Sequence, residues 1–316
     1  MSAAVVTLTA SAATAAETPE LSVLIPFFRD DPCDLVDRLN AQIGGLADPQ
    51  AVELALYDDG SGDEGLTARV AERVSAAPGP ARLFTGAPNA GRSTARNELS
   101  RQARAGYHLY LDADMAPDAE DFLARWLSVI EAHKPAAAFG GFSVAQIACA
   151  PQTALHYALA ASSEALPAAI RNRYPAKHLC TSNLLVRSDI MAAYRFDEGF
   201  KGWGWEDVEW AARVAADHTV THIDNPATHF GLEPAERLLA KFQASGPNFA
   251  RLIAKHPALK GQLPVYRAAQ LIKRLPGARL AKPIWASLAR GRVWPVRLRL
   301  IALKLWRASW YAEALP

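Results

Sequence analysis

Short apolar runs alternate with helix-patterned segments along the first half of the chain, and this alternation constrains the fold more than any other feature. The apolar runs occupy residues 21–28, 52–59, 81–84 and 107–114. Strands that alternate with helices predict an α/β protein with a mostly parallel sheet covered by helices on both faces. In such sheets ligands bind beyond the carboxyl ends of the strands. The acidic residues at those ends are Asp58, Asp59, Asp112 and Asp114.

The charge distribution divides the chain near residue 240. Residues 1–240 hold 19 basic and 31 acidic side chains, whereas residues 241–316 hold 15 basic side chains and one acidic residue, Glu313. The net charge of +2 is therefore a cancellation. We predict three parts, namely a disordered leader at 1–18, an α/β domain at 19–240 and a basic amphipathic helical extension at 241–316.

Composition excludes two classes of protein. A hydrophobic content of 50% and a mean hydropathy of −0.02 argue against a disordered chain and against a polytopic membrane protein. Residues 1–16 are uncharged, but they lack the basic start and the leucine-rich core of a secretory signal. The three cysteines are odd in number and lack metal-ligand spacing, which indicates a reducing, cytoplasmic compartment.

Two carboxylates one residue apart, Asp112 and Asp114, close the fourth apolar run. Alternation along a strand end would place both on one side, where they could bind one hard cation and leave positions open for phosphate oxygens. The alternative is that Asp114 caps the following helix.

The segment GWGWEDVEW at 202–210 combines flexible backbone, flat side chains and paired carboxylates. Trp203 and Trp205 offer faces suited to sugar rings, and Glu206 and Asp207 begin a helix. The helix dipole would keep a carboxylate at this position ionised and ready to accept a proton from a hydroxyl. The alternative is that the tryptophans belong to the core and the acidic pair caps the helix.

Three histidines, His218, His222 and His229, follow this helix. We expect at least two of them to be structural. His229 occupies a predicted loop, from which it could complete a metal shell that is poor in carboxylates.

Six motifs in order resemble the GT-A glycosyltransferases of family 2: LSVLIPFF, YDDGSGDEG, NAGRSTARNEL, YLDAD, SNLLVRSDIM and GWGWEDVEW. The last is similar to that of β-1,4-galactosyltransferases, chondroitin-polymerase-type enzymes and polypeptide N-acetylgalactosaminyltransferases. The resemblance covers residues 21–231. It implies a metal-dependent inverting transferase that moves a sugar from a UDP-sugar to a saccharide or lipid-linked acceptor, in cell-surface polysaccharide assembly. The absence of a QxxRW signature argues against a processive synthase. A non-catalytic nucleotide-sugar-binding or scaffolding protein is the alternative.

The resemblance also implies roles for individual residues on the nucleotide side. Pro26 and Phe27, together with Asp58 or Asp59, would hold the uracil and the ribose. Arg96 would lie near the base or the phosphates.

On the sugar side, the resemblance implies a metal site and a pocket. Asp112 would face the ribose or the metal, and Asp114 would bind Mn²⁺ or Mg²⁺, with His229 as a further ligand. Asn183 would line the sugar pocket, and Trp203 would stack on a sugar.

For the chemical step, the resemblance implies that Asp207 is the catalytic base. Glu206 would hold a hydroxyl of the donor or the acceptor. The mechanism would be an inverting single displacement.

The basic extension ends in a predicted amphipathic helix after Pro295. Helical spacing gathers one apolar face, formed by Leu298, Ile301, Ala302, Leu305 and Trp306. Basic residues and tryptophans suit the surface of an anionic membrane, so we expect a peripheral protein on the inner face of the cell membrane. The alternative is that this face docks on the α/β domain or on a protein partner. Basic charge alone does not choose among polyanions, and we do not expect a nucleic-acid partner.

Overall fold

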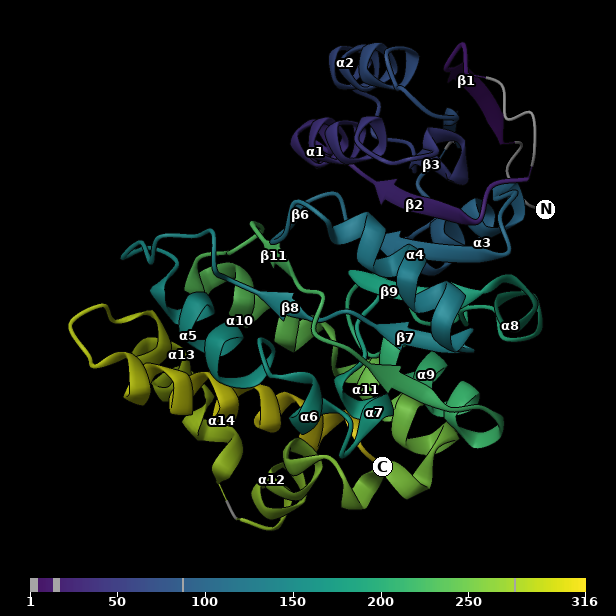
Figure 1. The fold of residues 1–316 in the computed structure, drawn as a ribbon. Coiled ribbons are helices and arrows are strands. Elements are labelled where there is room, and N and C mark those ends of the chain that lie inside the picture. The colour runs from purple at the N-terminus through teal and green to yellow at the C-terminus, as the bar shows by residue number, and fades with distance from the viewer. Residues whose placement is uncertain (1–4, 14–17, 87, 276) are drawn as a thin grey trace.

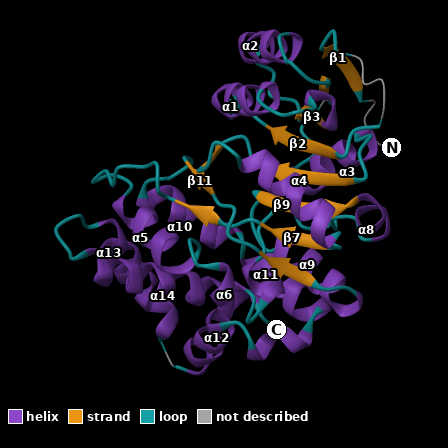
Figure 2. Ribbon diagram, viewed as in Figure 1, coloured by secondary structure: helices purple, strands orange, loops and turns teal. Residues whose placement is uncertain are grey.

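The computed structural model describes residues 5–13, 18–86, 88–275 and 277–316, and its centre is an eight-stranded sheet with the order β1-β4-β3-β2-β5-β9-β7-β10 (Figures 1 and 2). Strands β4, β3, β2 and β5 run parallel, and β10 is parallel to β7. The antiparallel members are β1 and β9. The strands are β1 Val6–Ala10, β2 Leu21–Phe27, β3 Val52–Asp58, β4 Ala81–Thr85, β5 Tyr107–Leu111, β7 Ala137–Phe139, β9 Asn183–Arg187 and β10 Val220–His222.

Helices cover both faces of this sheet, as the alternating pattern predicts. The helices whose apolar residues join one core are α1 Cys33–Gly44, α2 Glu64–Ser75 and α4 Phe122–His133. Those that join the opposite core are α3 Arg92–Gln102, α8 Ser188–Ala193 and α9 Glu206–Asp217. Val23 and Ile25 of β2 face the first core while Leu24 faces the second, so buried strands have apolar residues on both sides.

A second, three-stranded sheet lies beside the main one and carries the residues that follow β5. It consists of β6 Met115–Pro117, β11 Ala227–His229 and β8 Phe142–Ser143, with β11 in the centre. His229 of β11 pairs with Met115 of β6, and this register brings His229 next to Asp114. The connection after β8 contains α5 Ala154–Ser163, α6 Ala168–Arg171 and α7 Pro175–His178.

The expectation of a disordered leader is wrong for Val6–Ala10. These residues form β1, which extends the sheet by antiparallel pairing with β4. Ser11 reinforces this edge, since its hydroxyl donates to Gly79 O and accepts from Ala81 N. The apolar and β-branched residues of this segment suit an edge strand, whereas the low charge and high alanine content pointed to disorder. Residues 1–4 and 14–17 of the predicted leader lie outside the described residues.

The basic extension is helical, as predicted, but it is not a separate appendage. Its helices are α11 Gly246–Lys255, α12 Pro264–Arg274, α13 Lys282–Arg290 and α14 Val296–Ala314, and α10 Ala235–Ala244 leads into them. Figure 1 shows them gathered at one end of the molecule, away from α1, α2 and β1. Leu303 and Trp306 of α14 pack against α5, α10 and α13, and Tyr311 packs against α11 and the start of α9.

The buried face of α14 differs from the predicted one. Ala302 and Trp306 are buried as expected, but Leu298 and Ile301 are 38% and 56% exposed, and Leu303 is buried in their place. A straight-helix projection cannot choose between overlapping apolar stripes, and here the packing of α10, α12 and α13 around α14 decides the choice. No helix in the described ranges is long and apolar enough to span a bilayer.

Candidate active site

Three carboxylates converge on one buried guanidinium, that of Arg96 on α3. Its Nη2 lies 3.0 Å from Asp112 Oδ1, and its Nη1 lies 3.3 Å from Glu206 Oε1 and 3.7 Å from Asp207 Oδ1. Arg96 is only 2% exposed, so these ion pairs operate in a medium of low polarity. Burial alone would lower the pKa of Arg96, but the three carboxylates raise it. Arg96 therefore joins the turn after β5 to the start of α9, and its place near the base or the phosphates stays a prediction.

The two acidic residues that begin α9 differ in accessibility. The side chain of Glu206 is 5% exposed, whereas that of Asp207 is 22% exposed. Asp207 Oδ2 accepts a hydrogen bond of 3.2 Å from Thr181 N. A substrate hydroxyl can therefore reach Asp207 more readily than Glu206.

The Asp207 carboxyl holds its proton more tightly than a free aspartate. Burial raises its pKa, the charge of Glu206 adds to that effect, and Arg96 opposes it, for a value of about 7. The expectation that the helix dipole keeps this group ionised is corrected, because desolvation and a like charge outweigh the dipole. A pKa near neutrality suits a group that accepts and releases protons.

Asp112 and Asp114 have different protein partners, and the strand-based reason for placing them on one side does not hold. Strand β5 ends at Leu111, and the two aspartates lie in the turn before β6, so period-two alternation does not apply to them. Asp112 turns towards Arg96. Asp114 turns towards His229, with 3.0 Å between Asp114 Oδ2 and His229 Nε2.

Asp114 and His229 fit a divalent cation as a pair of ligands. Carboxylate and imidazole are common ligands of Mn²⁺, and His229 Nδ1 is buried without a hydrogen-bond partner among the described residues. A side chain at Gly231 would clash with Asp114 and come within 2.9 Å of His229 Nε2, so glycine leaves the pair open. Burial lowers the pKa of His229, but the hydrogen bond and charge of Asp114 raise it overall. No group of three or more His, Cys, Asp or Glu side chains within the described ranges is arranged around a common metal position.

The predicted nucleotide residues lie at the ends of β2 and β3, with one correction. Phe27 is 3% exposed and belongs to the core, so it cannot stack on a base, while the half-buried Pro26 lies next to it. The following residue, Phe28, is exposed, and the guanidinium of Arg29 lies 4.9 Å from its ring centre. Strand alternation explains why Phe28 is exposed and Phe27 is not, because adjacent side chains point to opposite faces.

Asp58 and Asp59 are both buried and both hold loops. Asp58 accepts hydrogen bonds from Ser61 N at 2.8 Å and Thr67 Oγ1 at 3.1 Å. Asp59 accepts from the backbone N–H groups that precede α3, those of Ala90 at 3.0 Å and Gly91 at 2.9 Å. The pKa of Asp59 is raised overall, because the effect of burial exceeds that of these two donors. The carboxylates therefore shape the two loops that follow β3 and β4.

Asn183 is fully buried, and its Nδ2 donates to Gly141 O at 3.0 Å and to Asn225 O at 2.8 Å. It ties β9 to the connections after β7 and β10. Its Oδ1 has no hydrogen-bond partner among the described residues, so its role in a sugar pocket stays a prediction. Trp203 is half-buried, and its ring centre lies 5.6 Å from that of Phe242.

Unpaired polar atoms gather at this site. The atoms that are buried and lack a hydrogen-bond partner within the described part of the chain include Arg96 Nε, Thr181 Oγ1, Ser182 Oγ, Glu206 Oε2, Asp207 Oδ1 and His229 Nδ1. Buried polar atoms are nearly always paired in folded proteins, so a concentration of exceptions indicates a place where a ligand makes the missing bonds. Two cavities, of about 310 and 490 Å³, lie elsewhere on the molecule.

Two residues of the connection after β8, His156 and Glu164, lie close enough to His229 to interact with it, and no motif pointed to either of them. His156 of α5 is 8% exposed, and its ring centre lies 6.1 Å from that of His229. Burial lowers the pKa of His156 to about 3, so its ring is neutral. Burial raises the pKa of Glu164, while the charges of His229 and Arg307 oppose this rise. An uncharged, alanine-rich run surrounds His156 and gave no sign of its position.

Two cations from the C-terminal helices also reach the site. Lys241 of α10 pairs with Glu233 at 2.7 Å, and its ammonium lies 5.8 Å from the ring centre of Trp203. The guanidinium of Arg307 on α14 lies 4.9 Å from the ring centre of Trp205 and 4.6 Å from that of Phe242. Their positions depend on helix docking, for which the sequence contains no local signal.

The other two histidines of the segment are structural, as predicted. His222 is buried, and its ring nitrogens contact Arg171 Nη1 and Pro175 O, each at 3.0 Å. His218 packs edge-on against Tyr194.

Comparisons with known proteins identify the family and the fold. The family described as glycosyl transferase family 2 matches residues 22–198. No curated protein sequence matches the chain. Among solved structures, a mannosyltransferase from Pyrobaculum calidifontis, in complex with GDP-Man and Mn²⁺, is 16% identical with a TM-score of 0.59, over 96% of this chain and 89% of that one.

A second solved structure is glucosyl-3-phosphoglycerate synthase from Mycobacterium tuberculosis, in complex with phosphoglyceric acid. It is 14% identical with a TM-score of 0.50, over 75% of this chain and 79% of that one. Both likenesses concern the fold, and they confirm the GT-A arrangement of a mostly parallel sheet between helices. The match to more than half of its length shows that the chain belongs to glycosyl transferase family 2 and is a transferase enzyme.

Proposed function

We propose that this enzyme is a metal-dependent inverting glycosyltransferase that moves a sugar from a UDP-sugar to a hydroxyl of a saccharide or lipid-linked acceptor. The observation that carries the proposal is Asp207, an accessible carboxylate with a pKa near neutrality, joined through Arg96 to the Asp112 turn. A base at this place can act on a hydroxyl while the nucleotide diphosphate binds beside Asp114.

In the proposed step, Asp207 Oδ accepts the proton of the acceptor hydroxyl as that oxygen attacks the anomeric carbon of the donor sugar. The bond from the anomeric carbon to the diphosphate oxygen breaks, and the diphosphate leaves with the bonding electrons. Attack opposite the leaving group inverts the anomeric centre. Glu206 holds a donor or acceptor hydroxyl, and Arg96 keeps both carboxylates oriented and balances their charge.

Asp114 and His229 would hold the Mn²⁺ or Mg²⁺ ion. When bound, such an ion neutralises the charge that develops on the leaving diphosphate. Asp112 supports this site indirectly, because its ion pair with Arg96 ties the turn that carries Asp114 to the start of α9. The chain's own contribution is thus to place the ligand pair and the base on one rigid unit.

The identity of the nucleotide follows from the motif resemblance, which favours UDP. The mannosyltransferase from Pyrobaculum calidifontis was solved with GDP-Man, so the donor screen must contain both bases. Pro26, Phe28 and Arg29 line the end of β2 and are candidates to contact the base.

We also propose that the C-terminal helices bind an anionic membrane, which would place the enzyme on the cytoplasmic face near lipid-linked acceptors for polysaccharide assembly. Supporting this are exposed large apolar side chains from α12 to α14, namely Leu271, Leu275, Leu280, Ile284, Val293, Trp294, Val296, Leu298 and Ile301. Exposed basic side chains accompany them at Lys273, Arg274, Arg290, Arg292, Arg297 and Lys304. Apolar side chains mixed with basic ones are typical of an interfacial surface.

The experiment that tests the function is a donor screen with purified enzyme and Mn²⁺. UDP- and GDP-sugars are supplied with and without saccharide acceptors, and release of the free nucleotide diphosphate is measured. Acceptor-dependent release of UDP supports the proposal. UDP binding without release under any condition supports the scaffolding alternative, and release of GDP alone changes the donor.

A further inference from the structure

The loop that delivers the catalytic carboxylates, residues 199–205, has a strained backbone. Gly202 and Gly204 have φ values of 73° and 96°, and Trp205 has a φ of 77°. Glycine adopts such angles without steric cost, but a bulky residue there is a rare outlier that persists only where its surroundings enforce it. Trp205 directly precedes Glu206, so whatever holds Trp205 also sets the entry of the chain into α9.

The C-terminal helix α14 holds the Trp205 side chain through the hydroxyl of Tyr311. Trp205 Nε1 donates to Tyr311 Oη at 2.9 Å, and Arg307 Nε donates to the same oxygen at 3.0 Å. Both acceptor positions of the hydroxyl are then used, so its proton is directed to Ser245 Oγ at 2.7 Å. Ser245 in turn donates to Phe242 O at 3.0 Å. Every proton in this chain of hydrogen bonds has a defined acceptor.

Aromatic packing reinforces the same contact. The rings of Tyr311 and Phe249 stack with centres 4.3 Å apart, and the Trp205 ring centre lies 5.0 Å from that of Phe249. The guanidinium of Arg307 lies over the Trp205 ring. Trp205 is therefore enclosed by side chains from α11 and α14.

Helix α11 holds the loop backbone through Asn248. Its Nδ2 donates to Lys201 O at 2.9 Å and Gly204 O at 3.1 Å, with Trp203 O at 3.4 Å. Asn248 is only 6% exposed, so water cannot easily replace these bonds. One side chain of the extension thus spans the loop from its middle to its end.

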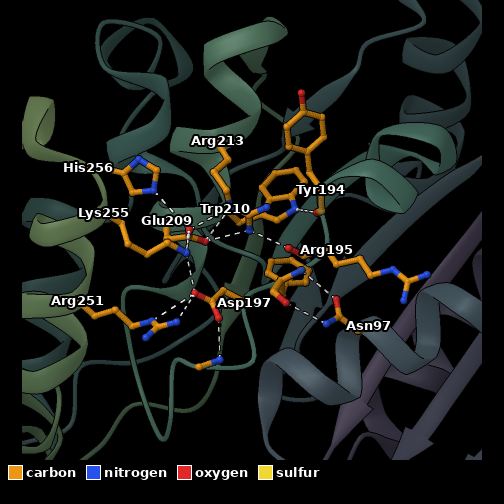
Figure 3. Close-up of polar contacts among 12 residues, drawn as sticks. Asn97, Tyr194, Arg195, Asp197, Glu209, Trp210, Arg213, Arg251, Lys255 and His256 are labelled. Atoms are coloured by element: carbon orange, nitrogen blue, oxygen red, sulfur yellow. Dashed lines mark hydrogen bonds and ion pairs between the residues drawn. The ribbon is translucent and has the colours of Figure 1, made fainter. Parts of the chain in front are cut away.

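Ion pairs join α11 to the body of α9 one turn further on. Glu209 is fully buried, and its Oε1 lies 2.6 Å from Lys255 Nζ and 3.4 Å from His256 Nε2 (Figure 3). Lys255 and Arg251 also hold Asp197 at 2.7 and 2.8 Å, just before the loop. Figure 3 shows these side chains from the extension reaching across to Asp197 and Glu209. The extension therefore contacts Asp197 before the loop, the loop itself through Asn248, and Glu209 after it.

We propose that the C-terminal helices are part of the catalytic unit, and that Tyr311 and Asn248 are positioning residues that fix Trp205 in its strained conformation and so aim Asp207. This inference rests on the proposed role of Asp207 as the base. Neither residue touches a substrate. Their effect passes through residues 201–205 to the first turn of α9.

The test compares Tyr311→Phe and Asn248→Asp with matched controls in the full-length chain. The first variant removes one hydroxyl, and the second replaces the donating amide with a carboxylate of the same size. Tyr266→Phe and Gln262→Glu make the same chemical changes elsewhere in the extension, at side chains that make no hydrogen bond to the loop in the described part of the chain. Two readouts are taken, the kinetics of UDP-sugar turnover and the hydrogen-exchange rate of backbone amides in peptides that cover residues 199–207.

In both variants we expect kcat to fall about ten- to a hundredfold, because a small misplacement of a catalytic group has effects of that size. The KM for the donor and the affinity for UDP should change less than about twofold, since the nucleotide residues lie on other elements. Loop exchange should accelerate in both variants and stay at the wild-type rate in both controls. A purely structural role would instead lower the thermal midpoint and leave kcat of the folded fraction unchanged.

Two results would overturn the inference. One is unchanged loop exchange in both variants, and the other is faster exchange without loss of kcat. If the wild-type enzyme turns over no donor, the proposed function fails, but the exchange measurement still tests whether Tyr311 and Asn248 hold the loop.

Discussion

The acidic region 1–240 and the basic region 241–316 use their charges differently. In the acidic region, several carboxylates are buried and individually paired: Glu53 pairs with Arg82 and Arg104, while Asp59 accepts backbone N–H groups. In the basic region, most cations are exposed, and a few pair with carboxylates of the acidic region. Opposite net charges therefore do not by themselves make two independent modules, because these ion pairs join the two regions.

The cations that join the two regions are Lys241, Arg251 and Lys255, whose partners Glu233, Asp197 and Glu209 all precede residue 240. The predicted boundary near residue 240 therefore marks a change in composition and not the edge of a folding unit. In the structure, the extension packs on the acidic region. This is the alternative to membrane binding that the sequence left open. The exposed apolar and basic side chains of α12–α14 remain available for a membrane.

The largest expected effect concerns the acidic region alone. Asp207→Asn should lower acceptor-dependent turnover by about 10²–10⁴-fold, because an amide cannot accept the proton of the hydroxyl. UDP affinity, measured by calorimetry, should be retained. Asp217→Asn makes the same change at the exposed end of α9 and should leave turnover intact. Normal turnover in Asp207→Asn would remove this residue from the mechanism.

Asp114→Ala should have the next largest effect. Loss of one of the two proposed ligands should weaken Mn²⁺-dependent UDP binding by about 10- to 100-fold. The measurement is UDP affinity with Mn²⁺ and with a chelator. Equal affinities in the wild-type protein under these two conditions would contradict the metal role, whatever the variant does.

Breaking a contact between the two regions should cost stability. Glu209→Gln leaves Lys255 and Arg213 beside a neutral, fully buried side chain, so we expect the free energy of unfolding to fall by about 3 kcal/mol. Denaturant titration measures it. The exposed pair of Arg38 and Asp34 provides the control, and Asp34→Asn should change stability by less than about 1 kcal/mol. Similar small losses in both variants would show that the regions are only loosely joined.

The pH dependence of turnover tests the charge arrangement around Asp207. The base must be deprotonated, and its pKa is raised to about 7, so kcat/KM should rise about tenfold per pH unit below 7 and level off above it. Glu206 is the strongest charge that raises this pKa. Glu206→Gln should therefore shift the rise to lower pH, even if the plateau is reduced. An unmoved profile would assign the titration to another group.

The smallest effect concerns the outward surface of the basic region. Trp294→Ser and Ile301→Ser each remove an apolar side chain that is about half exposed, so each should weaken binding to anionic vesicles several-fold, at about 1 kcal/mol per side chain. Co-sedimentation measures it. Leu8→Ser changes a similarly exposed residue on β1 and serves as the control. Equal binding by all three variants would move the membrane contact away from α13 and α14.

Local patterns were sufficient for much of the fold. The apolar runs became β2, β3, β4 and β5, and the segment after GWGW became α9, since buried strands and amphipathic helices carry their own signature. Of the acidic residues at strand ends and at the helix start, Asp112, Glu206 and Asp207 meet at Arg96. Strand ends were less certain: β5 stops at Leu111, which turns Asp112 and Asp114 in different directions.

The assignments that failed depended on which way a side chain points or on what packs against it. Phe27 enters the core although it lies next to exposed Phe28. Arg96, predicted near the base or the phosphates, gathers three carboxylates that no motif paired with it. No local periodicity encodes such pairings, because they depend on elements that meet only after folding.

The sequence by itself determined the α/β architecture, the family and the acidic residues that are candidates for the site. It did so because strand and helix periodicities and ordered motifs are local properties. Only the tertiary structure decided that Asp207 is the more accessible carboxylate at the start of α9, that Arg96 joins it to the Asp112 turn, and that the basic extension holds the loop before α9. These outcomes depend on burial and on contacts over long sequence separations, such as that of Trp205 with Tyr311, which no stretch of sequence contains.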